Sequence, residues 1–211
     1  MLVSPSIVAA SLSKIQDQVR ECENAGSFSF HLDVMDGNFV PNITVGPDFY
    51  DFLKGISRIR IESHLMVMRP DLYYKKFGRA GDLVYVHYES PINVLALLKR
   101  MRDEGVDAGL VINPDTPFQK VSDLLEYVQV LLIMSVYPGF SGQKFIDVSD
   151  KIHDASKYIK ENGFKTKIEV DGGINDNTAR IVKNAGADIV VSASYIFGGN
   201  ITERIRILSS I

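Results

Sequence analysis

A histidine and an aspartate stand two residues apart in the stretch FHLDVMDGNFVPNIT, residues 30–44, within an otherwise apolar run. Side chains at i and i+2 of a β-strand lie on the same side of the pleat, so His31 and Asp33 would point the same way. Imidazole and carboxylate groups can bind metal ions or transfer protons. The pair therefore predicts a site for one of these kinds of chemistry on a buried strand.

Histidine or acidic residues also stand at the ends of several later apolar runs. His64 and Asp171 each close such a run, and His87 with Glu89 closes another. If the runs are neighbouring parallel strands, His64 and Asp171 would join the first pair at one edge of the sheet. Two imidazoles and two carboxylates suit one divalent ion such as Zn²⁺, Fe²⁺, Mn²⁺ or Co²⁺. The alternative is a buried ion-pair network that holds no metal.

The elements that must position these residues alternate along the chain. Apolar runs that predict strands cover residues 2–10, 27–34, 58–67, 83–88, 107–113, 128–136, 166–171 and 188–193. Amphipathic stretches with helix start and stop signals cover residues 11–26, 92–105, 148–163 and 175–186. Ser13 is the expected N-cap of the first of these helices.

Strict alternation of strands and helices predicts parallel strands joined by right-handed crossovers. Both an open, doubly wound sheet and a closed barrel satisfy this pattern. No G-x-G-x-x-G follows the first strand, which counts against a dinucleotide-binding open sheet. Eight units in 211 residues, with no linker between them, predict a single α/β domain over residues 1–211, a (β/α)8 TIM barrel.

The composition excludes several classes of binding partner and cofactor. The net charge is −3 and no basic arm is present, so the sequence predicts binding to neither nucleic acid nor an anionic membrane. The single cysteine, Cys22, allows no internal disulfide and no zinc site built on several thiolates. No long apolar run and no signal peptide is evident, so we expect a cytoplasmic enzyme or binding protein.

Glycine-rich or small-residue turns follow the last three predicted strands. They are PGFSG at 138–142, DGG at 171–173 and SAS at 192–194. Barrels build phosphate sites at these places from backbone N–H groups and a short helix N-terminus. A single glycine there would be ordinary turn chemistry. The three turns together predict a phosphate site at the mouth of the barrel.

Long stretches of the chain resemble the ribulose-phosphate 3-epimerase family. The resemblance covers essentially the whole chain and is carried by PSIVAASLSKI, HLDVMDGNFVPNITVGP, SHLMVMRP, VHYES, AGLVINPDTP, MSVYPGFSGQKF, EVDGGIND and VVSASYIF. It implies a metal-dependent 3-epimerase that interconverts D-ribulose 5-phosphate and D-xylulose 5-phosphate through an enediolate. The expected cofactor is one divalent ion per subunit, the expected partner is a small sugar phosphate, and the expected assembly is a homo-oligomer.

The resemblance also implies roles for individual residues. The matches to metal ligands are His31, Asp33, His64 and Asp171, and the two acid–base carboxylates are Asp33 and Asp171. The matches to substrate-binding positions are Ser6, His64, Gly139, Phe140, Ser141, Gly142, Asp171, Gly172, Gly173, Ala193 and Ser194. Three methionines are expected either to give the site a soft, water-poor lining or to be plain core packing: Met35, Met66 and Met134.

Four positions depart from the family pattern. Ser141 and Ala193 replace glycines, Glu62 stands where aspartate is commoner, and Tyr137 replaces a shorter polar or acidic residue. None of these removes an expected ligand or base. Two alternatives stay open: a 3-epimerase of a related ketose phosphate such as D-allulose 6-phosphate, and a non-catalytic sugar-phosphate-binding barrel. The presence of two aspartates argues against the second, because binding alone does not need two opposed acids.

Overall fold

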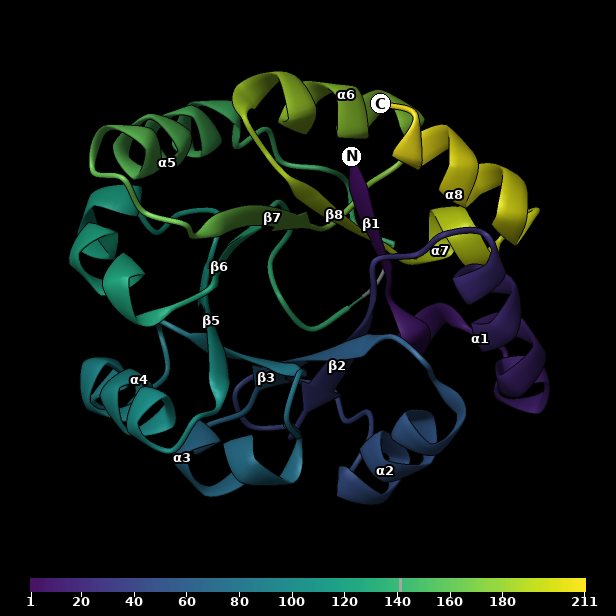
Figure 1. Cartoon of the computed structure of the whole chain (residues 1–211), viewed down its shortest axis with the longest axis horizontal. Helices are drawn as coiled ribbons and strands as arrows, with labels where there is room; N and C mark the ends of the chain where they lie inside the picture. Colours follow the sequence, from purple (N-terminus) through teal and green to yellow (C-terminus); the bar gives the residue numbers. More distant parts are fainter. Residues whose placement is uncertain (141) are drawn as a thin grey trace.

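The computed structural model of the chain describes residues 1–140 and 142–211, and its strands lie in one parallel sheet. They are β1 (Leu2–Pro5), β2 (Ser29–Met35), β3 (Arg60–Met66), β4 (Leu83–His87), β5 (Asp107–Ile112), β6 (Val130–Met134), β7 (Lys167–Asp171) and β8 (Ile189–Ser192). The sheet order is β1-β8-β7-β6-β5-β4-β3-β2. A parallel bridge between Ser6 and His31 links β1 to β2 and closes the barrel in Figure 1. The predicted (β/α)8 barrel is confirmed.

α-Helices form a ring outside the strands (Figure 1). They are α1 (Ile15–Asn24), α2 (Pro47–Ile56), α3 (Pro70–Tyr73), α4 (Val94–Asp103), α5 (Ser149–Glu161), α6 (Asp176–Ala185), α7 (Ser194–Phe197) and α8 (Ile201–Ser209). The connection from β5 to β6 forms 3-10 turns instead, at Phe118–Lys120 and Ser122–Tyr127. Within the described residues, none of the helices has the length and apolar character needed to cross a membrane.

The start of the chain differs from two sequence predictions. The first strand ends at Pro5 because a 3-10 turn, Ile7–Ala9, follows directly, so the expected strand 2–10 was too long. Ser13 is not an N-cap, since α1 begins at Ile15. The Ser13 hydroxyl lies 3.0 Å from the Ser11 hydroxyl and makes no capping bond to the helix backbone.

Helix α6 begins and ends as predicted. The Asn175 side chain accepts hydrogen bonds from the backbone N–H groups of Asn177 and Thr178, and the Thr178 hydroxyl accepts one from the Asn175 N–H. This reciprocal cap satisfies free N–H groups of the first turn. Gly186 ends the helix at φ +118°, which glycine adopts without a steric cost. The cap fixes the direction in which the chain leaves the turn after β7.

The interior of the barrel is divided into an apolar and a polar side. Leu83, Val111, Val130, Leu132 and Ile189 belong to one buried apolar cluster inside the sheet. On the other side, buried polar residues come mainly from β1, β2, β3 and β7: Ser4, Ser29, His31, Glu62, His64 and Glu169. Buried polar groups need hydrogen-bond partners, so this side must contain an organised network.

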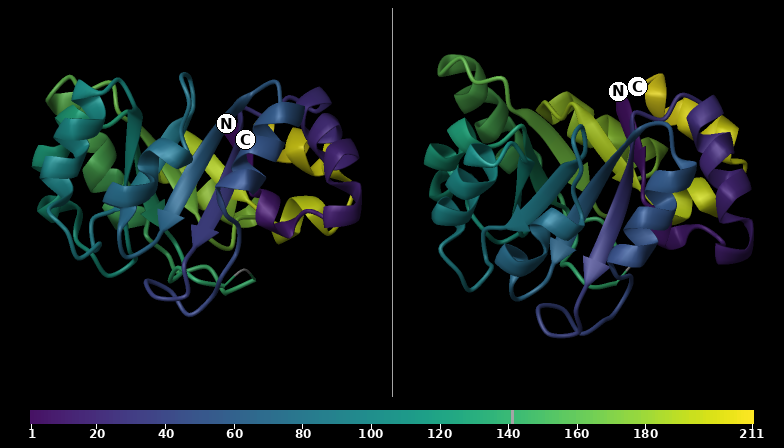
Figure 2. Two further views of the ribbon diagram at one scale, coloured as in Figure 1. Left: turned by 90° about the horizontal axis from the view of Figure 1, so that it is seen from below. Right: turned by 60° about the horizontal axis from the view of Figure 1, so that its bottom comes forward.

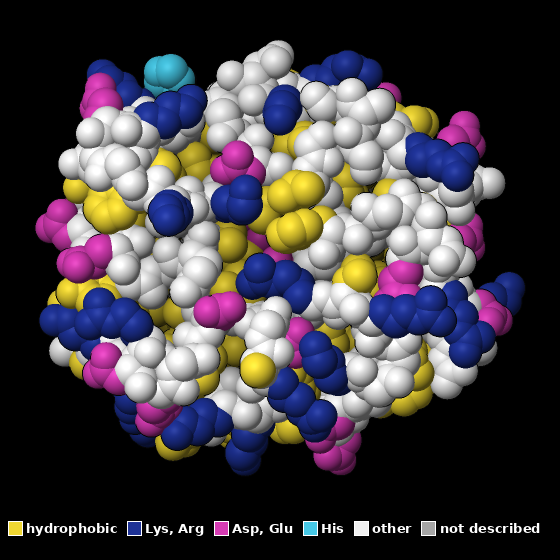
Figure 3. Space-filling model, viewed as in Figure 1, with side chains coloured by type: hydrophobic (Ala, Val, Ile, Leu, Met, Phe, Trp, Pro, Cys, Tyr) yellow, Lys and Arg dark blue, Asp and Glu magenta, His cyan; other side chains and the backbone are white. Residues whose placement is uncertain are grey.

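The two ends of the barrel have different surfaces. In Figure 2 the strands point to one end, where the loops after β2 and β6 project, while both termini lie at the other end. The Met1 amino group donates to the Ser209 carbonyl at that end, 3.0 Å away. Figure 3 shows this terminal face, where basic and acidic side chains are intermixed. The loops that can carry a site therefore lie on the opposite face.

Candidate active site

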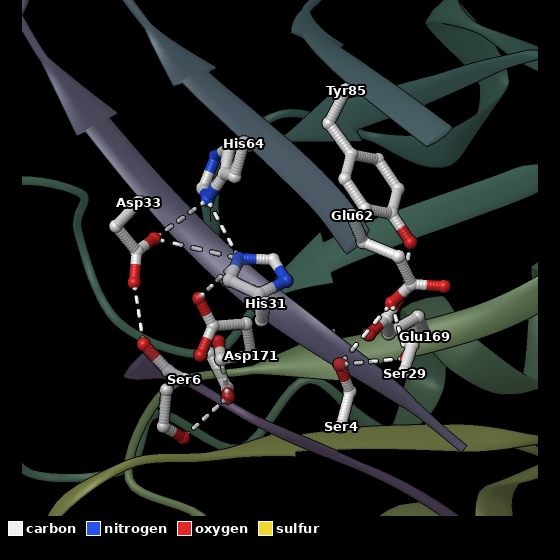
Figure 4. Close-up of polar contacts among 12 residues, drawn as sticks. Ser4, Ser6, Ser29, His31, Asp33, Glu62, His64, Tyr85, Glu169 and Asp171 are labelled. Atoms are coloured by element: carbon white, nitrogen blue, oxygen red, sulfur yellow. Dashed lines mark hydrogen bonds and ion pairs between the residues drawn. The ribbon is translucent and has the colours of Figure 1, made fainter. Parts of the chain in front are cut away.

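Four side chains meet near the carboxyl ends of β2, β3 and β7. His31 Nε2 lies 3.2 Å from His64 Nδ1, and His64 Nδ1 lies 3.1 Å from Asp33 Oδ1. Asp171 Oδ2 reaches to 3.8 Å from His31 Nε2. One ligand atom from each residue lies within 4.8 Å of the others (Figure 4). The fold thus brings together the whole group that the sequence nominated as metal ligands.

Strand register explains this convergence. β2 and β3 pair so that His31 faces Glu62 and Asp33 faces His64. Each strand therefore places a histidine and an acid on the inner face, two residues apart but in opposite order. The result is two layers of titratable side chains, one at the mouth and one deeper in the barrel.

The two histidines occupy different electrostatic environments. Burial opposes a charge on His31, but the neighbouring Asp33 and Asp171 carboxylates raise its pKa to about 10. Burial lowers the pKa of His64 to about 3, although the adjacent Asp33 carboxylate opposes that shift. In the metal-free cluster, His31 is therefore the imidazole that holds a second proton more strongly, and a bound metal ion would displace that proton.

The two aspartates also differ. Burial opposes ionisation of Asp33, yet the adjacent imidazoles of His31 and His64 hold its pKa well below the usual range. Ser6 Oγ donates to Asp33 Oδ2 over 2.7 Å. Burial and repulsion from Asp33 raise the pKa of Asp171 to about 7, against the attraction of His31. Two carboxyl groups with such opposite environments have the character of an acid–base pair.

The same four residues could hold a metal ion. Two imidazole nitrogens and two carboxylates are a donor set that suits divalent zinc and first-row transition metals. His31 and His64 are fully buried and Asp33 nearly so, so their side chains are fixed before any ion binds. The two imidazoles and two carboxylates therefore fit a divalent metal ion, which is the expected cofactor.

A pocket of about 510 Å³ opens above this cluster at the mouth of the barrel. Its volume is in the range of small-molecule sites. The pocket lining includes these residues nominated from the sequence: Ser6, Asp33, Met35, Met66, Met134, Gly139, Phe140, Gly142, Asp171, Gly172, Gly173, Ala193 and Ser194. His31 and His64 lie buried and do not line the pocket. Ser141 lies outside the described residues.

Close packing requires glycine in the turn after β7. Gly172 has φ +120°, and a Cβ atom there would lie 2.6 Å from a methyl group of Val136. Gly173 has φ +63°, and its Cβ would lie 2.9 Å from the backbone nitrogen of Phe145. The β7 turn therefore packs against the loop after β6, and both border the pocket.

Sequence reasoning gave no role to several residues of this region. His87 Nε2 lies 2.8 Å from His64 Nε2, and His87 Nδ1 lies 3.2 Å from Glu89 Oε2. Lys144 is the only lysine or arginine among the described pocket-lining residues. Each had a signal in the sequence: His87 stands in a His-x-Glu spacing at the end of a strand, and Lys144 follows two residues after the glycine-rich turn 138–142. Only the fold shows what these side chains approach.

An acid–base pair that belongs to a candidate metal cluster, at the carboxyl ends of barrel strands, defines a (β/α)8-barrel enzyme. The comparisons with known proteins narrow this class. The family model described as the ribulose-phosphate 3 epimerase family matches residues 2–197, and the chain belongs to that family.

Similar curated proteins carry names from the same family. The ribulose-phosphate 3-epimerase of Bacillus subtilis (strain 168) is 39% identical over 199 residues, which cover 93% of this chain and 92% of the relative. The chloroplastic ribulose-5-phosphate-3-epimerase of Arabidopsis thaliana is 42% identical over 202 residues, covering 94% and 72% of the two chains.

Solved structures with low sequence identity share the fold. Thiamine phosphate pyrophosphorylase from Pyrococcus furiosus superposes with a TM-score of 0.67 at 14% identity, covering 99% of this chain and 93% of that one. Phosphoribosyl anthranilate isomerase from Thermus thermophilus gives 0.65 at 15% identity, covering 100% and 97%. These likenesses concern the barrel alone.

Proposed function

We propose that this chain is a metal-dependent 3-epimerase that interconverts D-ribulose 5-phosphate and D-xylulose 5-phosphate. One observation carries the proposal: Asp33 from β2 and Asp171 from β7 enter a single pocket from different strands. Inversion at a carbon atom needs a base on one face and an acid on the other, and two carboxyl groups on separate strands can supply both. Family membership supports the same reaction.

The reaction begins with removal of the C3 proton, which is acidified by the adjacent C2 carbonyl. One aspartate accepts this proton, and the negative charge spreads onto the C2 oxygen as an enediolate. The other aspartate then donates a proton to the opposite face of C3. Asp33 and Asp171 exchange these roles when the reaction runs in the other direction.

We propose one divalent ion per chain, Zn²⁺, Fe²⁺, Mn²⁺ or Co²⁺, held by His31, Asp33, His64 and Asp171. When bound, such an ion supplies positive charge where the enediolate develops negative charge. Three methionine side chains keep water away from the reacting carbon: Met35, Met66 and Met134. Their thioethers are soft and apolar, so they raise the strength of nearby electrostatic interactions.

The phosphate group is proposed to lie at the opposite end of the pocket, against the turns after β6, β7 and β8. Backbone N–H groups at Gly173 and Ser194 are candidates for binding it. Lys144 adds a positive charge to the lining of this pocket. The sugar phosphate is thereby oriented with C3 between the two aspartates. Homo-oligomer formation and a cytoplasmic location stay predictions from the sequence.

Solvent exchange tests the proposal. The metal-loaded protein is incubated with D-ribulose 5-phosphate in D₂O, and NMR follows deuterium at C3 and the appearance of D-xylulose 5-phosphate. Both signals are expected, and Asp33→Asn should abolish them. Product formed without deuterium at C3 would contradict proton transfer. Binding without either signal would favour a non-catalytic barrel, and faster turnover of D-allulose 6-phosphate would favour the hexulose alternative.

A further inference from the structure

His64 contacts a second histidine that does not belong to the candidate metal cluster, and the two rings meet at their Nε2 edges. The rings of His64 and His87 have centroids 4.9 Å apart and an interplanar angle of 23°. Phe39, from the loop after β2, packs on His87 with a centroid distance of 4.9 Å. His87 is fully buried. Its ring therefore has little freedom to turn.

The contact between the two histidines needs one proton. His64 Nε2 and His87 Nε2 lie 2.8 Å apart, which is hydrogen-bonding distance for two nitrogen atoms. One nitrogen must carry the hydrogen and the other must offer a lone pair. A neutral imidazole carries hydrogen on one nitrogen only, so the choice at Nε2 decides the state of Nδ1 in each ring.

Glu89 determines which nitrogen of His87 carries the hydrogen. Its Oε2 lies 3.2 Å from His87 Nδ1, while its Oε1 accepts hydrogen bonds from the Asn113 N–H at 2.9 Å and from the Thr116 hydroxyl. A carboxylate with these donors acts as an acceptor only. His87 must therefore carry its hydrogen on Nδ1, and its Nε2 offers the lone pair. His64 then carries hydrogen on Nε2 and leaves Nδ1 bare. Since His64 Nδ1 and Asp33 Oδ1 are both proposed ligand atoms, their approach to 3.1 Å needs no hydrogen between them once an ion is bound.

Bare Nδ1 is the nitrogen of His64 that points into the cluster, 3.1 Å from Asp33 Oδ1 and 3.2 Å from His31 Nε2. We infer that His87 and Glu89 are positioning residues that present the Nδ1 lone pair of His64 to a divalent metal ion. Such partners fix the tautomer and orientation of ligating histidines and strengthen their binding. The inference rests on the proposed metal site.

The experiment compares zinc affinity in Glu89→Gln and Thr116→Val. Glutamine can turn its NH₂ group toward His87 and so permits the reverse proton order, whereas valine removes only the hydroxyl that anchors Glu89. Competition of Zn²⁺ with a chromophoric chelator should show about a 10- to 100-fold loss of affinity for Glu89→Gln. Thr116→Val should stay within about threefold of the unchanged protein.

The position of the hydrogen on each histidine ring can also be measured directly. In ¹⁵N-labelled, zinc-loaded protein, ring-nitrogen NMR should show zinc on Nδ1 of His64 and hydrogen on Nε2. His87→Gln, whose side-chain carbonyl can still accept from His64, should retain more zinc affinity than His87→Phe. Hydrogen on Nδ1 of His64 would overturn the inference. So would equal zinc affinity in folded Glu89→Gln, or an equal loss in Thr116→Val.

These results are separable from the epimerase proposal. Zinc affinity and nitrogen shifts report on the histidine pair even if no deuterium enters C3 of a ketose. Conversely, normal deuterium exchange with unchanged zinc affinity in Glu89→Gln would remove the positioning role and leave the proposed reaction intact.

Discussion

The two ends of the pocket are built from different parts of the chain. At the reacting end, Asp33 lines the pocket, and His31 and His64 lie buried beneath it; all three side chains come from strands and contact one another. At the other end, backbone turns form much of the wall, and the aromatic side chains of Tyr137 and Phe140 are 50% and 55% exposed. Substitutions at the first end should change the chemistry, whereas side-chain changes at the second should mainly change binding.

The reacting end itself has two unequal sides. Among the described residues, His64 has a hydrogen-bonding partner outside the cluster, His87, and the inferred order of donor and acceptor there rests on Glu89. His31 Nδ1 has no hydrogen-bond partner within the described chain, and in Figure 4 this nitrogen faces Glu62 and Glu169. One oxygen of each of these glutamates also accepts no hydrogen bond from the described residues. One histidine thus depends on a single acceptor, while the other faces two candidates.

The largest expected effect is at the two aspartates. Asp33→Asn and Asp171→Asn should each lower turnover by about 10² to 10⁴-fold from the lost proton transfer alone. Each also removes a candidate metal ligand, which adds to the loss. Steady-state rates on D-ribulose 5-phosphate at saturating metal measure the loss. If either variant kept more than about a tenth of the activity, the scheme with two carboxyl groups would be wrong.

Sequence reasoning could predict this end of the site because its signals are local. The spacing of His31 and Asp33 already implies a shared face of a strand. Alternation of strands and helices then predicts that strand ends meet, which brings in His64 and Asp171. No tertiary contact had to be known for that step.

The parts that sequence reasoning missed depend on tertiary contacts. Ser13 has a good capping residue type, but the neighbouring 3-10 turn starts the helix later, at Ile15. His87 was noticed at a strand end, yet its proposed role follows from its contact with His64, which depends on how β3 and β4 pair. Element boundaries and partner choice are therefore set by packing rather than by pattern.

The next effect concerns metal retention. His64→Ala should purify with much less metal and a nearly unchanged fold, because one neutral ligand is lost. His31→Ala should also lose metal and be less stable by about 3 to 5 kcal/mol, because nearby buried carboxylates lose their positive partner. Elemental analysis and thermal melts separate the two variants. Equal melting temperatures would mean that the two histidines do not differ in this way, and full metal content in His64→Ala would remove it from the ligand set.

A smaller effect tests the two acceptors on the His31 side. Glu62→Gln and Glu169→Gln should each weaken zinc binding by less than about tenfold, because one carboxyl group stays available to His31 Nδ1. The double variant should lose more than the sum of the single effects, since both candidate acceptors are then changed. Chelator competition gives the three affinities, and Ser29→Ala serves as control because it removes a donor to the other oxygen of Glu62. If one of the single variants bound zinc as weakly as the double variant, only that glutamate would hold the His31 ring.

The smallest effect is expected at Ala193, where the resemblance to the family predicts glycine. Ala193 has φ −108°, so its backbone does not require the left-handed region that favours glycine. It lines the pocket directly before α7, and its methyl group changes the space near the proposed phosphate but leaves the backbone N–H in place. Ala193→Gly should therefore change KM by a small factor and leave kcat nearly unchanged. Steady-state kinetics on D-ribulose 5-phosphate measure both constants, with the unchanged protein assayed in parallel. A large change in kcat at constant KM would mean that position 193 acts on the reacting carbon, and that the two ends of the pocket have been assigned the wrong way round.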